Sequence, residues 1–262
     1  MSRVSKVRFT SYEKSIFEAL DLLDASARLP QEGLIIIKPN LTNSSPPPVT
    51  TPVEAAQAVY RYCKLHSKAR VAIGEGTGTG KTRDVFSALG YSDFAKKYQV
   101  ELIDFNEADT VVLKREDTLH LKQFHMPEVA RDAFIISLPV LKDHSFTVTT
   151  VSMKNMFGLA PEPFYGGSWN KSRLHSPSTH HSVVDICLYK KPSLSIIDAS
   201  VALTGNHLWG ANKKLGFIIA SFDPVAADAV GSSLLGHDPA KIEYLVRSNG
   251  VLGEMNSIEV VS

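Results

Sequence analysis

Short apolar runs alternate with segments of helical periodicity along most of the chain. Residues 34–38, 70–74, 134–140 and 194–198 are mostly apolar runs, which are typical of strands buried on both faces of a sheet. Between them, segments such as residues 53–63 place apolar side chains every three to four positions, which predicts crossover helices. The alternation predicts an α/β fold with a mainly parallel sheet and helices on both faces. We expect residues 35–37, 71–73, 135–138 and 195–197 to lie side by side.

Other parts of the chain carry different patterns. Residues 107–126 alternate between polar and apolar side chains, which predicts a small antiparallel excursion in the middle of the chain. Helices are predicted to start at Thr51 and Pro52, to cover residues 148–157 up to Gly158, and to run from Asp223 to Gly236. Residues 161–176 predict a long irregular loop. We expect one α/β domain over residues 1–262, with two lobes that meet near residues 107–126 as the alternative.

Composition and charge exclude several classes of protein. With 28 basic and 27 acidic residues the net charge is +1, which gives no basis for binding nucleic acid. The longest apolar runs span only a few residues, far short of the ~20 that a membrane helix requires. The first residues show no secretory signal. We therefore expect a cytoplasmic protein that has neither a nucleic acid nor a membrane as its partner.

Polar side chains follow the predicted strands at the points where these strands end. Because the carboxyl ends of parallel strands meet at one edge of a sheet, such side chains are candidates for a common ligand site. The glycine-rich segment GEGTGTGKT does not have the spacing of a phosphate-binding P-loop, but its glycines allow a ligand to approach closely. The candidate ligand-binding residues are Lys38, Asn40, Thr42, Gly76, Gly78, Lys142, Asn155 and Asp198.

The candidate catalytic residues are His144, Lys154 and Glu75. His144 follows Lys142 directly off a predicted strand and precedes the predicted helix that carries Lys154 and Asn155. Imidazole suits proton transfer near neutral pH, so His144 is the candidate for exchanging protons. We expect a structural or merely exposed role for the other histidines outside the 175–181 region, namely His66, His120, His125, His207 and His237, and also for His180.

Several segments together resemble a known prokaryotic family, the domain of unknown function 362. The resemblance is carried by IIIKPNL, VAIGEGTG, IISLPVLKDHSFTVTTVSMKNMFGLAP, LSIIDA and FDPVAADAVGSSLLGHDP, from about Lys38 to the C-terminus. Members of that family are often joined to ferredoxin-like modules with iron–sulfur clusters. The two cysteines here, Cys63 and Cys187, cannot supply such a cluster, so the chain resembles the bare domain. It departs from the family pattern after Asp198, where it reads TGNHLWG.

A more distant likeness is to the lactate racemase family, whose catalytic domain holds a nickel-pincer nucleotide on a lysine. In this likeness Lys154 resembles the cofactor lysine, His144 the proton-transferring histidine and His175 a metal ligand. A racemase with two bases would need Glu75 as the partner of His144, and a carboxylate suits that role only where burial raises its pKa.

These observations favour an enzyme or a cofactor-dependent redox protein. Its ligand would be a small anionic molecule, or an organometallic or nucleotide-derived cofactor, bound at the strand ends by lysine side chains. The alternative is a non-catalytic module that docks on an iron–sulfur protein as its partner. An enzyme requires a concave pocket into which several of the candidate side chains converge, whereas a docking module requires an exposed apolar patch.

Overall fold

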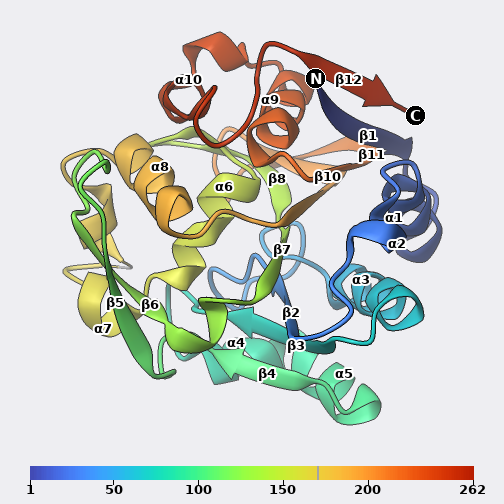
Figure 1. The fold of residues 1–262 in the computed structure, drawn as a ribbon, viewed down its shortest axis with the longest axis horizontal. Helices are drawn as coiled ribbons and strands as arrows, with labels where there is room; N and C mark the ends of the chain where they lie inside the picture. The colour runs from blue at the N-terminus through green and yellow to red at the C-terminus, as the bar shows by residue number, and fades with distance from the viewer. Residues whose placement is uncertain (170) are drawn as a thin grey trace.

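One large sheet forms the centre of the protein, in a computed structural model that describes residues 1–169 and 171–262 (Figure 1). Its central strands run parallel, and the four predicted strands lie side by side, so the predicted fold class is confirmed. The strand order is β12 (Ile258–Val261), β1 (Ser2–Arg8), β11 (Ala211–Ser221), β10 (Leu194–Thr204), β7 (Phe134–Leu138), β2 (Leu34–Pro39), β3 (Arg70–Glu75) and β4 (Glu101–Asp104).

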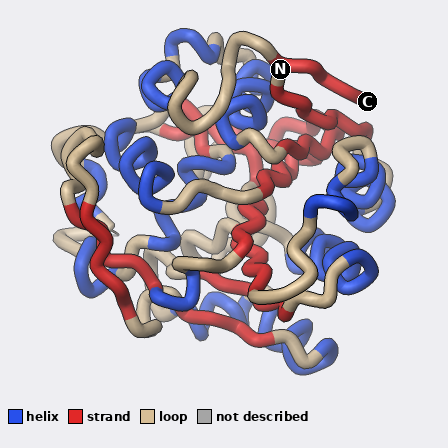
Figure 2. The backbone as a smooth tube through the Cα atoms, viewed as in Figure 1, coloured by secondary structure: helices blue, strands red, loops and turns tan. Residues whose placement is uncertain are grey.

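Helices cover both faces of this sheet because successive strand side chains point to opposite sides. In β2, Ile35 and Ile37 belong to one apolar cluster and Ile36 to another, and all three are fully buried. The first face packs against α1 (Tyr12–Asp21), α2 (Ala25–Arg28), α3 (Val53–His66), α4 (Thr82–Ala88) and α5 (Tyr91–Tyr98). The second face packs against α6 (Ser152–Asn155), α8 (Thr179–Tyr189), α9 (Pro224–Leu235) and α10 (Glu243–Ser248), and Figure 2 shows both layers in blue around the red strands.

Two small strand pairs lie beside the main run of strands. The predicted excursion is a separate antiparallel pair, β5 (Thr110–Lys114) and β6 (Gln123–Pro127). The second pair is β8 (Val140–His144), which runs parallel to β10, and β9 (Val148–Thr150), which returns antiparallel to β8.

The predicted helix over residues 148–157 is wrong in its first part. Val148 to Thr150 form β9, which pairs with β8, and α6 begins only at Ser152. The buried Asp228 fixes that start, because its carboxylate accepts hydrogen bonds from the backbone N–H groups of Ser152 and Met153 at 2.8 and 3.1 Å. A 3-10 turn, η2 (Met156–Leu159), then follows α6 directly.

Other helix boundaries follow the sequence more closely. Asp223 caps α9 by accepting from the N–H groups of Val225 and Ala226, and Gly236 ends it with a φ of 101°. Helix α3 starts at Val53, but Thr51 does not cap it and instead donates its hydroxyl to the carbonyl of Leu138. The predicted loop over 161–176 contains α7 (Glu162–Tyr165) and the 3-10 turn η3 (Ser172–His175), and residue 170 lies outside the described residues.

The remaining elements are two short 3-10 turns, η1 (Glu128–Ala130) and η4 (Pro239–Lys241). In the part of the chain that the structure describes, every helix is too short or too polar to cross a membrane.

Candidate functional site

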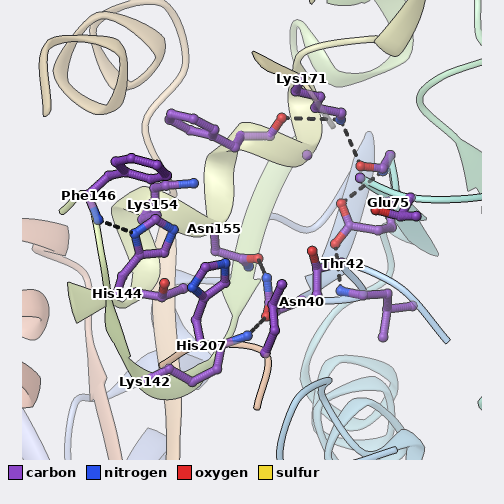
Figure 3. Close-up of a pocket in the computed structure, with 18 of the residues that line it drawn as sticks. Asn40, Thr42, Glu75, Lys142, His144, Phe146, Lys154, Asn155, Lys171 and His207 are labelled. Carbon is purple, nitrogen blue, oxygen red and sulfur yellow. Dashed lines mark hydrogen bonds between the residues drawn. The ribbon is translucent and has the colours of Figure 1, made fainter. Parts of the chain in front are cut away.

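A cavity of about 250 Å³ opens beyond the carboxyl ends of β2, β3 and β8 (Figure 3). The structure brings together at this cavity every candidate site residue except Asp198. From the predicted set it is lined by Lys38, Asn40, Thr42, Glu75, Gly76, Gly78, Lys142, His144, Lys154, Asn155 and His175. The other lining residues are Leu41, Thr79, Phe146, Thr150, Phe157, Gly158, Trp169, Lys171, His207 and Leu208.

Asp198 lies away from this cavity, because its strand does not end where the sequence pattern suggested. Strand β10 continues to Thr204, so Asp198 sits in the middle of the strand. Its carboxylate accepts hydrogen bonds from the Tyr12 hydroxyl at 2.9 Å and from the backbone and hydroxyl of Ser200 at 2.9 and 2.6 Å. Burial raises the pKa of Asp198, and the group links α1 to the sheet.

The floor of the cavity is a buried ion pair between neighbouring parallel strands. Lys38 at the end of β2 lies 2.8 Å from Glu75 Oε1 and 3.0 Å from Oε2, at the end of β3. The two carboxylate oxygens also accept from the backbone N–H groups of Gly76, at 2.8 Å, and Leu41, at 3.1 Å. Burial lowers the pKa of Lys38, and the charge of Glu75 opposes that shift. Both charges are therefore engaged within the protein.

Gly158 allows this ion pair to pack against the backbone of η2. A Cβ atom at that position would collide with Glu75 Oε1 and with Nζ and Cε of Lys38. The segment Lys154-Asn155-Met156-Phe157-Gly158 therefore ends in glycine because the cavity floor leaves no space for a side chain at that position.

Amide side chains connect the floor to Lys142 on β8. Asn155 accepts through Oδ1 from Lys38 Nζ at 3.3 Å and from Asn40 Nδ2 at 3.2 Å. Its Nδ2 donates to the Lys38 carbonyl and to the Ser137 hydroxyl, which fixes the orientation of the amide. Lys142 Nζ donates to Asn40 Oδ1 at 2.5 Å and to the Val49 carbonyl at 2.9 Å.

Lys154 differs from the other lysines of the cavity. Among the described residues its ammonium has neither a hydrogen-bond acceptor nor a carboxylate partner, and it lies 3.5 Å from the centre of the Phe157 ring. Burial, followed by the charges of Lys142, Lys171 and Lys38, lowers the pKa of Lys154 to about 7. Neither Glu75, which pairs with Lys38, nor Asp198, which accepts from Tyr12, is a partner of Lys154.

Lys171 is a fourth ammonium at the cavity, which sequence reasoning missed. Its Nζ donates to the carbonyls of Gly76 at 2.7 Å and Phe157 at 3.4 Å. Burial lowers the pKa values of Lys171 and Lys142 to about 7 each, although the Glu75 charge acts in the opposite direction. Among the described lining residues Glu75 is the only carboxylate, and Lys38 already pairs with it. Three lysines therefore remain without a counter-charge.

The imidazole of His144 is neutral in this environment. Its Nδ1 accepts a hydrogen bond from the Phe146 N–H at 3.0 Å, so in the neutral ring the proton sits on Nε2. Burial, then the Lys154 charge, strongly lowers the pKa of His144. The ring stacks on His207, with centroids 4.1 Å apart and planes at 19°. Nε2–H is thus a hydrogen-bond donor for a ligand.

His207 and His175 complete the imidazole set, and burial lowers the pKa of each to about 4. His175 Nδ1 lies 3.1 Å from the Thr179 hydroxyl. No group of three or more His, Cys, Asp or Glu side chains in residues 1–169 and 171–262 is arranged to hold a metal ion. Among the described residues these imidazoles are therefore not part of a cluster of metal-ligating side chains.

Aromatic side chains flank the entrance to the cavity. Phe146, in the turn between β8 and β9, stacks on Trp169 with centroids 6.2 Å apart, and both are about half exposed, at 52% and 49%. Trp169 also lies against His175, at 4.7 Å. No sequence pattern pointed to Lys171 as a site residue, whereas His207 lies in the TGNHLWG segment that departs from the expected family pattern.

A comparison with solved structures agrees with this fold. The lactate racemase apoprotein from Thermoanaerobacterium thermosaccharolyticum matches with a TM-score of 0.55 at 14% identity, over 92% of this chain and 58% of that one. The chain thus spans less than two thirds of the racemase, and the likeness concerns the fold alone. A thylakoid-associated protein of Synechocystis sp. is 26% identical over 250 residues, which cover 91% of this chain and 76% of that protein. The family model described as domain of unknown function (DUF362) matches residues 35–233, well over half of the chain, and the protein therefore belongs to the DUF362 family.

Proposed function

We propose that this protein is an enzyme whose cavity binds a small anionic molecule, with Lys154 as the main contact. The observation that carries the proposal is the Lys154 ammonium at the cavity, without a partner among the described residues and with Lys142 and Lys171 beside it. Lys142 and Lys171 would each offer their remaining N–H to the same ligand.

Electrostatics supports an anion at this position. Burying an ammonium without a counter-charge is unfavourable, and the three ammonium groups of this cavity that lack one also repel one another. One negative charge at about 4 Å from an ammonium contributes roughly 4 kcal/mol of attraction at an effective dielectric constant of about 20. A cavity of about 250 Å³ is at the small end for ligand sites, which are commonly ~300–1,000 Å³, so the ligand is expected to be small.

The protonation states suggest how the reaction groups divide their roles. With a pKa of about 7, Lys154 is partly neutral near pH 7 and suits the role of base or nucleophile. His144 carries its proton on Nε2 and suits the role of hydrogen-bond donor to a ligand oxygen. This assignment replaces the expectation that His144 itself exchanges protons, and it gives Glu75 the role of holding Lys38.

A phosphate-bearing, nucleotide-derived cofactor would use the same ammonium groups. Any metal on such a cofactor would need most of its ligands from the cofactor, because the described side chains do not form a metal site. The convergence of candidate side chains into one concavity is what an enzyme requires, so we favour it over a module that docks on an iron–sulfur partner.

Isothermal titration calorimetry with oxalate, lactate and inorganic phosphate tests the proposal. Lactate is included because the structural neighbour is a lactate racemase. We expect the wild-type protein to bind at least one of these anions. Lys154→Met should weaken binding about 10- to 150-fold, which corresponds to the ~1.5–3 kcal/mol of a charged hydrogen bond.

The matched control is Lys64→Met, which removes an exposed lysine on α3 and should leave the affinity unchanged. Binding of none of the three anions, or equal affinity of wild type and Lys154→Met, would overturn the proposal.

A further inference from the structure

We propose, on the basis of the proposed function, that Lys154 forms an imine with a small 2-oxo acid, a carbonyl compound that carries its carboxylate beside the carbonyl group. The inference starts from the freedom of the Lys154 amine. Its Nζ is bonded to no described residue, and Figure 3 shows the side chain among those that line the cavity, beside the His144 ring.

The other three lysines are held by the protein. Lys38 donates to Glu75, Asn155 and the Pro39 carbonyl, so its donors are used. Lys142 and Lys171 each donate to two acceptors of the protein. Only Lys154 can move its nitrogen onto a ligand atom without giving up a hydrogen bond.

A nucleophilic amine must also be unprotonated for part of the time. Burial and the neighbouring ammonium groups lower the pKa of Lys154 to about 7, so near neutral pH a large fraction of the amine is neutral. A lysine in an apolar pocket or beside another cation is a known arrangement for imine formation. The titratable side chains that line the cavity with it are Lys38, Glu75, Lys142, His144, Lys171, His175 and His207.

The cavity also indicates why the carbonyl compound should be a small acid. Lys142 and Lys171 each retain one N–H that can bind a carboxylate, while Glu75 is neutralised by Lys38. A carboxylate adjacent to the carbonyl carbon lets the ligand meet these cations while Lys154 reaches that carbon. The volume of about 250 Å³ limits the ligand to a few carbon atoms.

The chemical step balances without an oxidant or a reductant. The neutral Lys154 nitrogen attacks the carbonyl carbon, an N–C bond forms, and the carbonyl electron pair moves to the oxygen, which accepts a hydrogen bond from His144 Nε2–H. A proton passes from the nitrogen to this oxygen and gives a carbinolamine. The hydroxyl group then takes a proton from the ammonium of Lys142 or Lys171 and leaves as water. The product is the protonated imine, and solvent returns one proton to the donor lysine.

Reductive trapping tests the proposal on the full chain. The protein is incubated with pyruvate, reduced with borohydride, digested and mapped by mass spectrometry. We expect one reduced pyruvate adduct on Lys154, labelled at least about tenfold faster than the exposed Lys64. Acetone lacks the carboxylate and should label Lys154 at least about tenfold more slowly than pyruvate does. The labelling rate should rise as the pH approaches 7, because the Lys154 amine loses its proton, and fall well above pH 7, because Lys142 and Lys171 lose theirs.

Lys154→Arg cannot form an imine, so it should give no reduced adduct at position 154, while Lys64 is labelled at the wild-type rate. Oxalate binding by the wild-type protein separates this proposal from the proposed function. Labelling of Lys154 no faster than of Lys64, labelling of another cavity lysine in its place, or equal labelling by acetone would overturn the imine. If wild type then still binds oxalate, the proposed function stands, whereas loss of oxalate binding by wild type removes the proposed function itself.

Discussion

Replacing Glu75 with glutamine should strongly destabilise the fold. Glu75 and Lys38 are almost completely buried, with side-chain exposures of 3% and 1% and an N–O distance of 2.8 Å. Glu75→Gln leaves the buried Lys38 ammonium without its counter-charge and turns an amide NH₂ toward the N–H of either Gly76 or Leu41. Breaking a buried ion pair on one side costs about 3–5 kcal/mol. Total stability is only about 5–15 kcal/mol, so this is a large fraction.

Urea denaturation and calorimetry at pH 7 measure this loss, which should lower the melting temperature by about 6–20 °C. Glu13→Gln is the matched control, because Glu13 pairs with Arg61 at 2.7 Å while both side chains are about half exposed. The control should cost less than about 1 kcal/mol. Burial lowers the Lys38 pKa, so an unpaired Lys38 should lose its proton more easily, and the Glu75→Gln protein should regain stability as the pH rises toward 10. An equal loss in both variants would refute the reasoning.

Three further predictions concern the surroundings of the cavity. In the ligand-free protein the pKa values of Lys142 and Lys171 are about 7, against ~10.4 in the unfolded chain. The unfolded chain therefore binds more protons between pH 7 and 10, and each lysine should raise the free energy of unfolding there by about 1 kcal/mol per pH unit. Saturating oxalate should flatten this rise in pH-dependent melts, and a flat ligand-free profile would contradict the low pKa values. Asp228→Ala removes the acceptor for the Ser152 N–H, the Met153 N–H and the Tyr244 hydroxyl, so it should lower the free energy of unfolding by at least about 3 kcal/mol. It should also weaken oxalate binding, because Asp228 fixes the start of α6, and Asp228→Asn should be intermediate. Unchanged stability in urea denaturation would argue against this. Val148 has a φ of 65°, which suits glycine, so the stability of Val148→Gly should stay within about 1 kcal/mol of wild type. The control Val71→Gly in β3 should lose more than about 2 kcal/mol of stability. Equal losses in the two variants would show that Val148 carries no strain.

The sheet could be predicted from the sequence where burial alone decides the structure. Strands β2, β3, β7 and β10 are covered on both faces, so their apolar runs are visible without knowledge of the neighbours. Helix α9 could be placed because Asp223 and Gly236 act locally at its two ends. In both cases the signal lies within the segment itself.

The errors arise where a distant part of the chain decides the outcome. Residues 148–157 have apolar positions that suit a helix, yet Val148 to Thr150 pair with β8, and Asp228 from α9 sets the start of α6. Asp198 and Ser200 interrupt the apolar run of β10, although the strand continues beyond them with the buried Ala202 and Leu203. For that reason Asp198 was expected at a strand end.

The positions of Lys171 and His207 have the same kind of cause. Lys171 belongs to an irregular segment and reaches the cavity by donating to the backbone of Gly76, 95 positions earlier in the chain. His207 belongs to the loop between β10 and β11, where Asp143 accepts from the Gly205 N–H at 2.6 Å and also pairs with His237. Neither position follows a predicted strand, so reasoning from strand ends could not find them.

The charged side chains of the cavity fall into two groups, one with counter-charges from the protein and one without. Lys38 and Glu75 come from adjacent parallel strands, and both are satisfied by each other, by backbone groups and by Asn155. Lys142, Lys154 and Lys171 come from β8, α6 and the segment before η3, and no carboxylate faces them among the described lining residues. Folding alone gives no reason to bring three ammonium groups together, because each is desolvated and each repels the others. The first group therefore explains the stability of the floor, whereas the second group is the reason for proposing an anionic ligand.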